Sequence, residues 1–248
     1  MSFYCNSQTN IKTIEYLGKT YLLFPENQTE TSLTDLPTNW KENIIRKKYK
    51  LDRKQSIDGQ RIQFFKNSNS IPAKIFELRK NKLNGEYKQF HENGQIRFSL
   101  KYSNNKIDNG LFVEYHSNGQ RKLSGNLKNG LRDSKWTEYY VNGKIKSEGN
   151  YFSGNYIFCD LVLLTKYYEY KVGEWEYYFP NGQIKANGVY KTETRNVANN
   201  CINLNCGTLN KEWSFYDTNG NIVPLKNAIK NNMVSNQEIF DKRVYNTE

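Results

Sequence analysis

Two histidines are the side chains of this sequence with the clearest capacity for metal or proton chemistry. His91 and His116 are its only histidines, and each stands two residues before an Asn-Gly pair. If these pairs are equivalent positions of a repeat, the two imidazoles are neighbours on one face and could bind a metal or respond to pH. Two ligands leave a zinc site incomplete, however, and Tyr140 and Phe179 occupy the same position later in the chain. We therefore favour an aromatic packing role for both histidines.

The four cysteines, Cys5, Cys159, Cys201 and Cys206, are the other candidates for metal or redox chemistry. The pair Cys201 and Cys206 could close a small disulfide loop or contribute to a metal site, but no second cysteine pair or nearby histidine completes a zinc set. The first residues, MSFYCNSQTN, lack the charged start and apolar run of a secretory signal, and no apolar stretch approaches membrane-spanning length. We therefore expect reduced thiols and a cytoplasmic protein.

The motifs of familiar catalytic machinery are missing from the sequence. It has no Gly-x-Ser-x-Gly elbow, no glycine-rich phosphate loop and no His-Glu-x-x-His segment. We therefore expect a protein that is not an enzyme, with no catalytic residues, no cofactor and no metal. Its chemistry must then lie in binding, for which 19 Tyr, 13 Phe and 4 Trp in 248 residues are the main resource.

The aromatic residues belong to a repeated segment that predicts β-hairpins. Each copy places aromatic residues before an Asn-Gly pair and an alternating run after it, which is a strong hairpin signal because both turn residues tolerate positive φ. The pairs follow at intervals of 25, 24, 39 and 38 residues, so insertions fall after the third and fourth copies. We expect a two-residue turn at each pair. The five pairs are Asn93-Gly94, Asn118-Gly119, Asn142-Gly143, Asn181-Gly182 and Asn219-Gly220.

Two rows of aromatic side chains follow from the repeat, and we call them the Trp row and the Tyr row. Positions three apart on a strand point to opposite faces, so the two rows should line opposite faces unless a bulge intervenes. The Trp row, six residues before the turn Asn, comprises Tyr87, Phe112, Trp136, Trp175 and Trp213. The Tyr row, three residues before the turn Asn, comprises Phe90, Tyr115, Tyr139, Tyr178 and Tyr216. Seven residues after the Asn, the second strand carries Gly125, Gly149 or Gly188, where a large ring or another backbone can come close.

The Trp row is the candidate partner-binding surface. Its members change along the array, and Trp and Tyr are favoured anchors of binding hot spots. We expect this face to meet a partner or a terminal cap, with polar rim contacts from Glu138, Glu174 and Glu176. The alternative is that Trp is the stronger packer and that this row is buried. The uniform Tyr row suits packing between equivalent neighbours.

The predicted fold is mostly β, an elongated, twisted antiparallel sheet of hairpin repeats with irregular terminal caps. We divide the chain into an N-terminal cap at 1–80, a repeat array at 81–227 and a C-terminal cap or tail at 228–248. The N-terminal cap should hold two strands around Leu17-Gly18-Lys19, a short helix at 40–49 and the worn second half of a hairpin at 58–65. The first insertion should supply an extra strand and the second a polar loop. A short helix after Pro224 could cap the last repeat.

The chain is strongly basic, with 36 Lys and Arg against 25 Asp and Glu and a net charge of +11. The densest basic run, at 46–54, could touch nucleic acid or an anionic membrane. A solvated face is the simpler interpretation, because charge alone indicates only that acidic partners are steered inward. We expect no nucleic-acid partner.

The repeats resemble the variant MORN repeat, in the form found in the bacterial YwqK-like antitoxin family. The resemblance rests on the segment GEWEYYFPNGQIK at 173–185 and its four partner segments, and it covers about 82–227. It implies a non-catalytic protein-binding repeat protein, an antitoxin or immunity protein that neutralises a cognate toxin by occupying its active surface. The alternative is a MORN-type scaffold that binds an anionic membrane surface or an assembly partner. Because nuclease toxins have basic clefts that would repel an inhibitor of charge +11, we expect an acidic or neutral toxin, not a nuclease.

Overall fold

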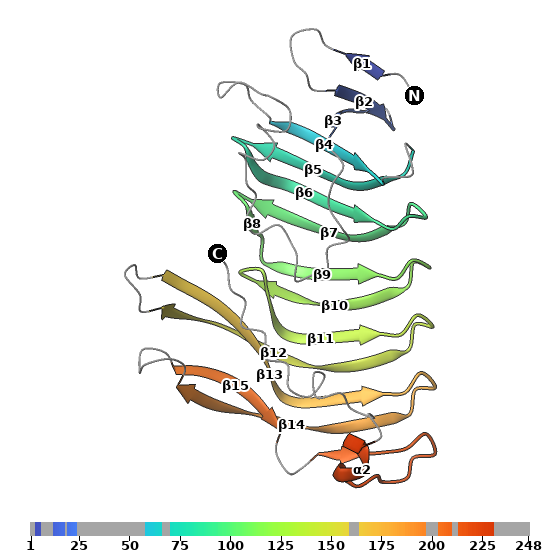
Figure 1. Ribbon diagram of the computed structural model, residues 1–248, viewed down its shortest axis with the longest axis vertical. Helices are drawn as coiled ribbons and strands as arrows, with labels where there is room; N and C mark the ends of the chain where they lie inside the picture. The colour runs from blue at the N-terminus through green and yellow to red at the C-terminus, as the bar shows by residue number, and fades with distance from the viewer. Residues whose placement is uncertain are drawn as a thin grey trace. The chain divides into compact units, whose positions relative to one another are not determined.

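The computed structural model separates into two compact units, each of which is built of β-strands (Figure 1). The N-terminal unit comprises Met1–Asp108 with Ser117–Gly119, and the C-terminal unit comprises Asn109–His116 and Gln120–Thr247. The structure describes residues 3–5, 12–17, 19–23, 58–65, 70–158, 164–196, 203–209 and 213–230. The predicted basic run at 46–54 and helix at 40–49 lie outside these residues. The division at Asp108 falls inside the predicted repeat array, and the three predicted segments stay a prediction.

The N-terminal unit is a sheet in which strands adjacent in the chain pair antiparallel, with one exception. Its strands are β1 (Phe3–Cys5), β2 (Lys12–Tyr16), β3 (Lys19–Leu23), β4 (Gly59–Phe64), β5 (Pro72–Arg79), β6 (Lys82–Phe90), β7 (Ile96–Ser103) and β8 (Lys106–Ile107). The predicted strands on either side of Leu17-Gly18-Lys19 are confirmed as the β2–β3 hairpin. The segment at 58–65 does form a strand, but it is the first strand of the β4–β5 hairpin and pairs parallel with β3. A parallel pair needs a long crossover, which the chain length between β3 and β4 allows.

The C-terminal unit continues the same construction with longer hairpins. Its elements are β9 (Gly110–Tyr115), β10 (Arg121–Lys128), β11 (Leu131–Tyr139), β12 (Ile145–Phe158), β13 (Leu164–Tyr178), β14 (Ile184–Asn196), β15 (Asn203–Leu209), β16 (Ser214–Phe215) and α2 (Leu225–Lys230). Strands β9 to β15 pair in chain order, all antiparallel, and β16 pairs with β14. The predicted mostly-β fold of hairpin repeats is confirmed.

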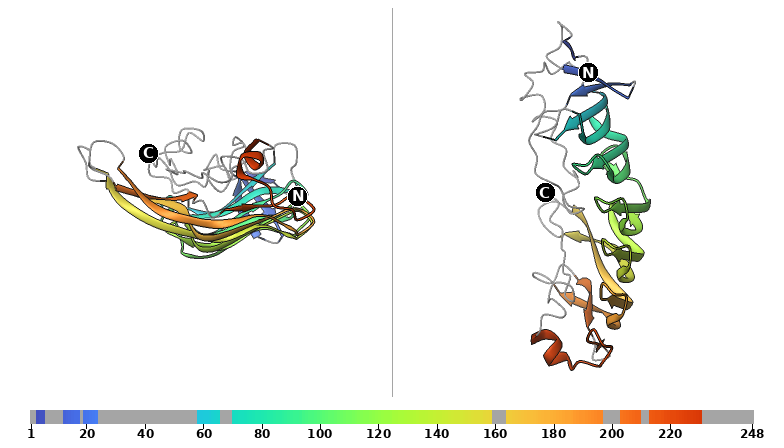
Figure 2. Two further views of the ribbon diagram at one scale, coloured as in Figure 1. Left: turned by 90° about the horizontal axis from the view of Figure 1, so that it is seen from below. Right: turned by 90° about the vertical axis from the view of Figure 1, so that its right-hand side faces the viewer.

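The first insertion lengthens a hairpin instead of adding a strand, and the second forms strands instead of a polar loop. The first extends β12 and β13, which stay paired from Ser147↔Tyr177 out to Phe158↔Leu164. The second, predicted as a polar loop, extends β14 to Asn196 and adds β15 as its partner. In Figure 1 both long hairpins reach beyond the ends of β10 and β11, and Figure 2 shows β12 and β13 bending along their length. The alternating Thr residues of KTETRN suit a strand, which explains why this segment extends β14 and does not form a loop.

The hairpin turns have three residues where we predicted two. In the first copy His91 N donates to Gln95 O (2.8 Å) and Gly94 N donates to His91 O (2.9 Å), so the loop is a type I turn followed by a glycine in the left-handed region. The glycine φ angles of 81° to 93° at the five Asn-Gly pairs confirm the predicted positive φ. The Asn itself has ordinary φ, and its side chain closes the turn, as where Gln183 N donates to Asn181 Oδ1 (3.0 Å).

A short helix follows the last hairpin, as predicted. Helix α2 begins after Pro224 and lies against β16, with Ala228 fully buried. The predicted continuation beyond residue 230 lies outside the described residues.

Candidate functional site

The Trp row is buried. Phe112, Trp136 and Trp175 of the C-terminal unit are 0 to 3% exposed, Trp213 is half-buried, and Tyr87 of the N-terminal unit is 3% exposed. The structure therefore places these rings in the interior, as in the alternative that makes Trp the stronger packer. Contact of the Trp row with a partner stays a prediction.

Each tryptophan of the row is seated on a glycine of the preceding hairpin. A Cβ on Gly125 would lie 2.2 Å from Trp136 Cδ2, and a Cβ on Gly149 would lie 2.3 Å from Trp175 Cδ2. The strand register shifts immediately after both glycines, which is a β-bulge. A bulge leaves a backbone carbonyl without its ladder partner, and the indole satisfies it, since Trp175 Nε1 donates to Asn150 O (3.1 Å). The predicted close approach of a ring at these strand glycines is confirmed.

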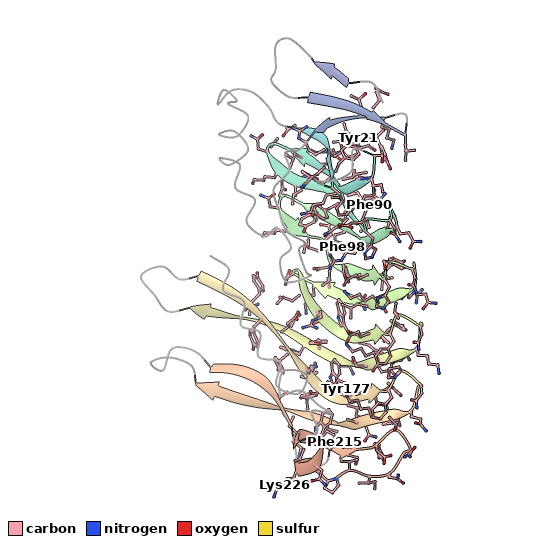
Figure 3. All side chains as sticks on the ribbon, turned by 45° about the vertical axis from the view of Figure 1, so that its right-hand side comes forward. Tyr21, Phe90, Phe98, Tyr177, Phe215 and Lys226 are labelled. Atoms are coloured by element: carbon pink, nitrogen blue, oxygen red, sulfur yellow. The ribbon has the colours of Figure 1, made fainter. Side chains whose placement is uncertain are left out.

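Tyrosines interleave with the tryptophans to form one ladder on this face. Tyr151 stands edge-on to Trp136 and Trp175, at centroid distances of 6.4 and 5.2 Å, and Tyr190 stands edge-on to Trp175 and Trp213, at 6.0 and 5.0 Å. Edge-to-face pairs at these distances are the favoured aromatic geometry. The ladder is therefore a continuous core for an otherwise single-layered sheet, and Figure 3 shows its side chains along the strands around Tyr177 and Phe215.

Charged groups are packed among these rings. Lys171 Nζ lies 4.6 Å from the Trp175 ring centroid and donates to the Tyr177 hydroxyl (3.0 Å). Arg132 pairs with Glu169 (2.6 Å), whose side chain is 4% exposed. A buried charge is stable only when it is paired, so these contacts hold the ladder face in one arrangement.

The Tyr row lies on the opposite face, as predicted. Trp175 stacks on Tyr177, two residues further along the strand, whereas the Tyr178 hydroxyl donates to Glu176 (2.5 Å). The bulge near the turn falls in the second strand, between the partners of Tyr177 and Tyr178, so alternation along the first strand is preserved. All five members of the Tyr row are half-buried, so this face leaves its aromatic side chains partly exposed, whereas the ladder face buries most of its rings.

A hollow of about 560 Å³ lies on the Tyr-row face of the C-terminal unit. Its charged lining comprises Lys135, Glu148, Glu174 and Glu176, which come from strands β11, β12 and β13. Pairing places Glu148 directly opposite Glu176, and Trp175 opposite both Gly149 and Gly188. Trp175, Gly149 and Gly188 contribute backbone to the hollow, because the Trp175 ring packs on the ladder face.

The hollow has a negative electrostatic character. Lys135 Nζ pairs with Glu148 (2.9 Å), and this hydrogen bond and the Glu148 charge raise the pKa of Lys135. Burial, the hydrogen bond to Glu176 and the charges of Glu176 and Glu148 raise the pKa of Tyr178 above its usual range. Both shifts stabilise the protonated form, as excess negative charge does.

The predicted rim residues divide between the two faces. Glu174 and Glu176 line the hollow, but Glu138 lies on the ladder face, where it pairs with Lys146 (2.9 Å). Sequence reasoning missed Glu148 and Lys135, which reach the hollow from neighbouring strands. The strand register could have identified Glu148, because this residue precedes Gly149, which a hairpin alignment places opposite Trp175.

The histidine position is a packing position whose polar tip bonds to the next repeat. His116 Nε2 lies 3.0 Å from Tyr139 O, and at the equivalent place Tyr140 donates from its hydroxyl to Tyr178 O (2.7 Å). These contacts explain why either His or Tyr can occupy this position. Within the described residues no three His, Cys, Asp or Glu side chains gather as metal ligands.

Two of the four cysteines lie in described strands, Cys5 in β1 and Cys206 in β15. Cys159 and Cys201 lie outside the described residues, so the possible Cys201–Cys206 loop stays a prediction. No helix among the described residues is long and apolar enough to cross a membrane.

Comparison with known proteins finds a family match in three of the hairpins. Residues 83–104, 132–152 and 171–192 match the family model described as a MORN repeat variant. No curated protein matches the chain. The matched segments cover the turns and adjoining strand residues of the hairpins β6–β7, β11–β12 and β13–β14, including Tyr87, Trp136 and Trp175. MORN repeats are in general modules that bind proteins or membranes. The chain therefore contains three segments that are similar to the MORN repeat variant.

Proposed function

We propose that this chain is a non-catalytic binding protein whose partner is another protein, and that the partner docks on the Tyr-row face of the C-terminal unit. The observation that carries the proposal is the difference between the two faces. The ladder face has its aromatic rings in the interior, whereas the Tyr-row face presents half-buried tyrosines, of which Tyr216 lines an open hollow. Tyrosine combines a large apolar ring with a polar tip, which suits a surface that is exposed when free and buried in a complex.

The finer proposal is that the partner is a toxin and that the chain is an antitoxin or immunity protein. Its support is the resemblance of the repeats to the bacterial YwqK-like family. Inhibition by occlusion needs a rigid surface and no catalytic group, which an interlocked sheet provides. The proposed location is the cytoplasm.

The rival proposal is a scaffold that binds an anionic membrane surface. Three glutamates line the hollow, and carboxylates repel anionic headgroups. The charge of this face therefore favours a protein over a lipid surface.

Capture from a lysate of the native host tests the proposal. The wild-type chain should retain a specific protein that Tyr216→Ala, at the hollow, retains poorly, while Tyr115→Ala, at the equivalent position of the second repeat, serves as the matched control. Expression of the captured protein alone should then arrest growth, and co-expression of the chain should restore it. Equal capture by both variants would exclude the hollow as the docking site. A captured protein that does not affect growth would exclude the antitoxin role, and binding only to anionic vesicles would support the scaffold.

A further inference from the structure

A row of polar side chains crosses the face of the N-terminal unit that carries Tyr87. Gln63 on β4 lies directly opposite Lys74 on β5, and Lys74 lies directly opposite Gln89 on β6, two residues after Tyr87. Phe98, labelled in Figure 3, continues the row on β7. Directly opposite residues project from the same face with Cβ atoms about 5 Å apart, so the ammonium of Lys74 lies between two side-chain amides.

The row is buried although its polar groups lack partners. Lys74 is 9% exposed and Gln89 is 5% exposed. Lys74 makes no hydrogen bond or ion pair with any residue that the structure describes, and Gln89 Oε1 is buried without a hydrogen-bond partner among the same residues. Burial, followed by the charge of Arg97, lowers the pKa of Lys74, which is the direction expected of an ammonium without an anion beside it. Because a buried charge is stable only when it is paired, this row lacks a negative group.

The next two repeats show which group is missing. Gln89 stands four residues before the turn Asn, and the same position holds Glu114 in the second repeat and Glu138 in the third. Glu114 pairs with Lys122 (3.1 Å), and Glu138 pairs with Lys146 (2.9 Å). The first repeat therefore has an uncharged amide at the place where its neighbours hold a carboxylate against a cation.

We infer that this row binds an oxyanion, a carboxylate or a phosphate group, at the place that a glutamate fills in the next two repeats. The Lys74 ammonium supplies a positive charge and N–H donors, and the Gln89 amide supplies two more donors once its nitrogen is turned toward the anion. Arg61, which is 3% exposed and stands two residues before Gln63 on the same face, adds a second positive charge. The site lies in the N-terminal unit, so it does not depend on the docking surface proposed for the C-terminal unit.

Calorimetric titration of the full chain with inorganic phosphate, and separately with acetate, tests the site. Sodium chloride at equal ionic strength is the reference, because it screens charges without offering an oxyanion. We expect the wild-type chain to bind an oxyanion and Lys74→Met to bind it at least about tenfold more weakly, which is the change in affinity that the loss of one hydrogen bond to a charged group produces. Binding of phosphate alone would identify a phosphate group as the occupant, and binding of acetate as well would identify the site as one that also accepts a protein carboxylate.

Lys88→Met is the matched control. Lys88 precedes Gln89 on β6, so it lies on the opposite face, where it pairs with Glu86 (2.9 Å). Its replacement should change the oxyanion affinity less than about twofold, because an exposed ion pair contributes little. Equal binding by the wild-type chain and Lys74→Met, or no heat of binding from either oxyanion with the wild-type chain, overturns the inference.

Gln89→Glu distinguishes an oxyanion site from a polar patch without a ligand. It gives the first repeat the carboxylate that the next two repeats have. In chloride, we expect this variant to melt at a higher temperature than the wild type, followed by circular dichroism, because the new carboxylate pairs with Lys74. We also expect it to lose oxyanion binding, because the place is filled and negatively charged. A lower melting temperature in chloride, or oxyanion binding equal to that of the wild type, would contradict the inference.

The folding of Lys74→Met provides a further check. Replacing an unpaired buried charge by an apolar side chain of similar length should leave the melting temperature in chloride unchanged or higher. A variant that does not fold would mean that Lys74 already has an anionic partner within the chain, and the oxyanion site would then be excluded.

Discussion

Replacing Gly149 by alanine should unseat Trp175. The backbone at Gly149 has no positive φ, so alanine brings no conformational strain there. The added Cβ would instead lie 2.3, 2.4 and 2.5 Å from three atoms of the indole, which is more than 1 Å closer than van der Waals contact permits. The ring must therefore move or the strands must separate.

The cost of that movement follows from the contacts of the ring. Overpacking a core position costs about 1–3 kcal/mol. A displaced indole also loses its hydrogen bond to Asn150 O, which is worth about 1 kcal/mol. We therefore expect Gly149→Ala to lower the free energy of unfolding of the C-terminal unit by about 2–4 kcal/mol. Urea denaturation followed by circular dichroism measures it.

Two further variants make this prediction refutable. Gly154→Ala is the control, since its Cβ would meet ring atoms of Phe152 and Tyr168 at 3.0–3.2 Å, and the Phe152 ring is 45% exposed and can give way. It should cost less than about 1 kcal/mol, in the usual range for a surface site. Trp175→Ala should cost about 3–5 kcal/mol, and adding Gly149→Ala to it should cost little more. The steric reasoning is refuted if the two substitutions are additive within about 0.5 kcal/mol, the usual limit for independent sites, or if Gly149→Ala is no worse than Gly154→Ala.

Further predictions concern the turns, the buried ion pair, a buried phenol and the thiols. Gly182→Val should destabilise the protein by about 1–3 kcal/mol, because a branched residue is strained at a φ of 93°; a neutral effect in urea denaturation would contradict the turn assignment. Glu169→Ala should cost about 3–5 kcal/mol because it leaves Arg132 without its buried partner, and a much smaller loss would mean that the pair is solvated. The Tyr102 hydroxyl is buried without a hydrogen-bond partner among the described residues, and burial, followed by the charge of Tyr87, raises its pKa. A raised phenol pKa makes stability fall as pH rises past the ordinary value of about 10, so Tyr102→Phe should leave stability at pH 7 unchanged or higher and should reduce the alkaline loss; an unchanged alkaline slope would count against it. Thiol titration under denaturing conditions should find all four cysteines reduced, or two if the close pair is bridged, and a bridge to either of the other two would contradict a cytoplasmic location.

The sequence predicted the hairpins and a close approach at the strand glycines because both depend on local signals. A glycine in a strand position predicts that a large ring or another backbone comes close, but not that the ring is Trp175 at Gly149. The number of turn residues was not predictable from Asn-Gly alone, because that pair fits both the two-residue turn and the three-residue turn with glycine last. Strand pairing beyond the repeat was missed because KTETRN carries no apolar residue.

The sequence could not show which face is open or where the hollow lies, because both depend on how neighbouring strands pair. Both rows are aromatic, so their composition could not decide which was buried. The hollow needs Glu148 opposite Glu176, and that pairing follows from the bulge after Gly149, which shifts the register by two residues, from Gly149↔Trp175 to Asn150↔Val172. The expectation of an acidic or neutral partner came from the net charge of the whole chain and stays a prediction.

Each tryptophan packs on a glycine of the hairpin that precedes it, so the packing between hairpins of the C-terminal unit follows the direction of the chain. Removing the last hairpin would bare Gly188 and leave Trp136 and Trp175 in place, whereas removing the β9–β10 hairpin would take Gly125 away from Trp136. A ribosome delivers the chain in the same order, so every glycine seat is made before the ring that occupies it. The nascent unit can thus close one hairpin at a time onto a surface that is already complete, and a chain that stalls midway exposes an empty glycine seat, not an unburied tryptophan.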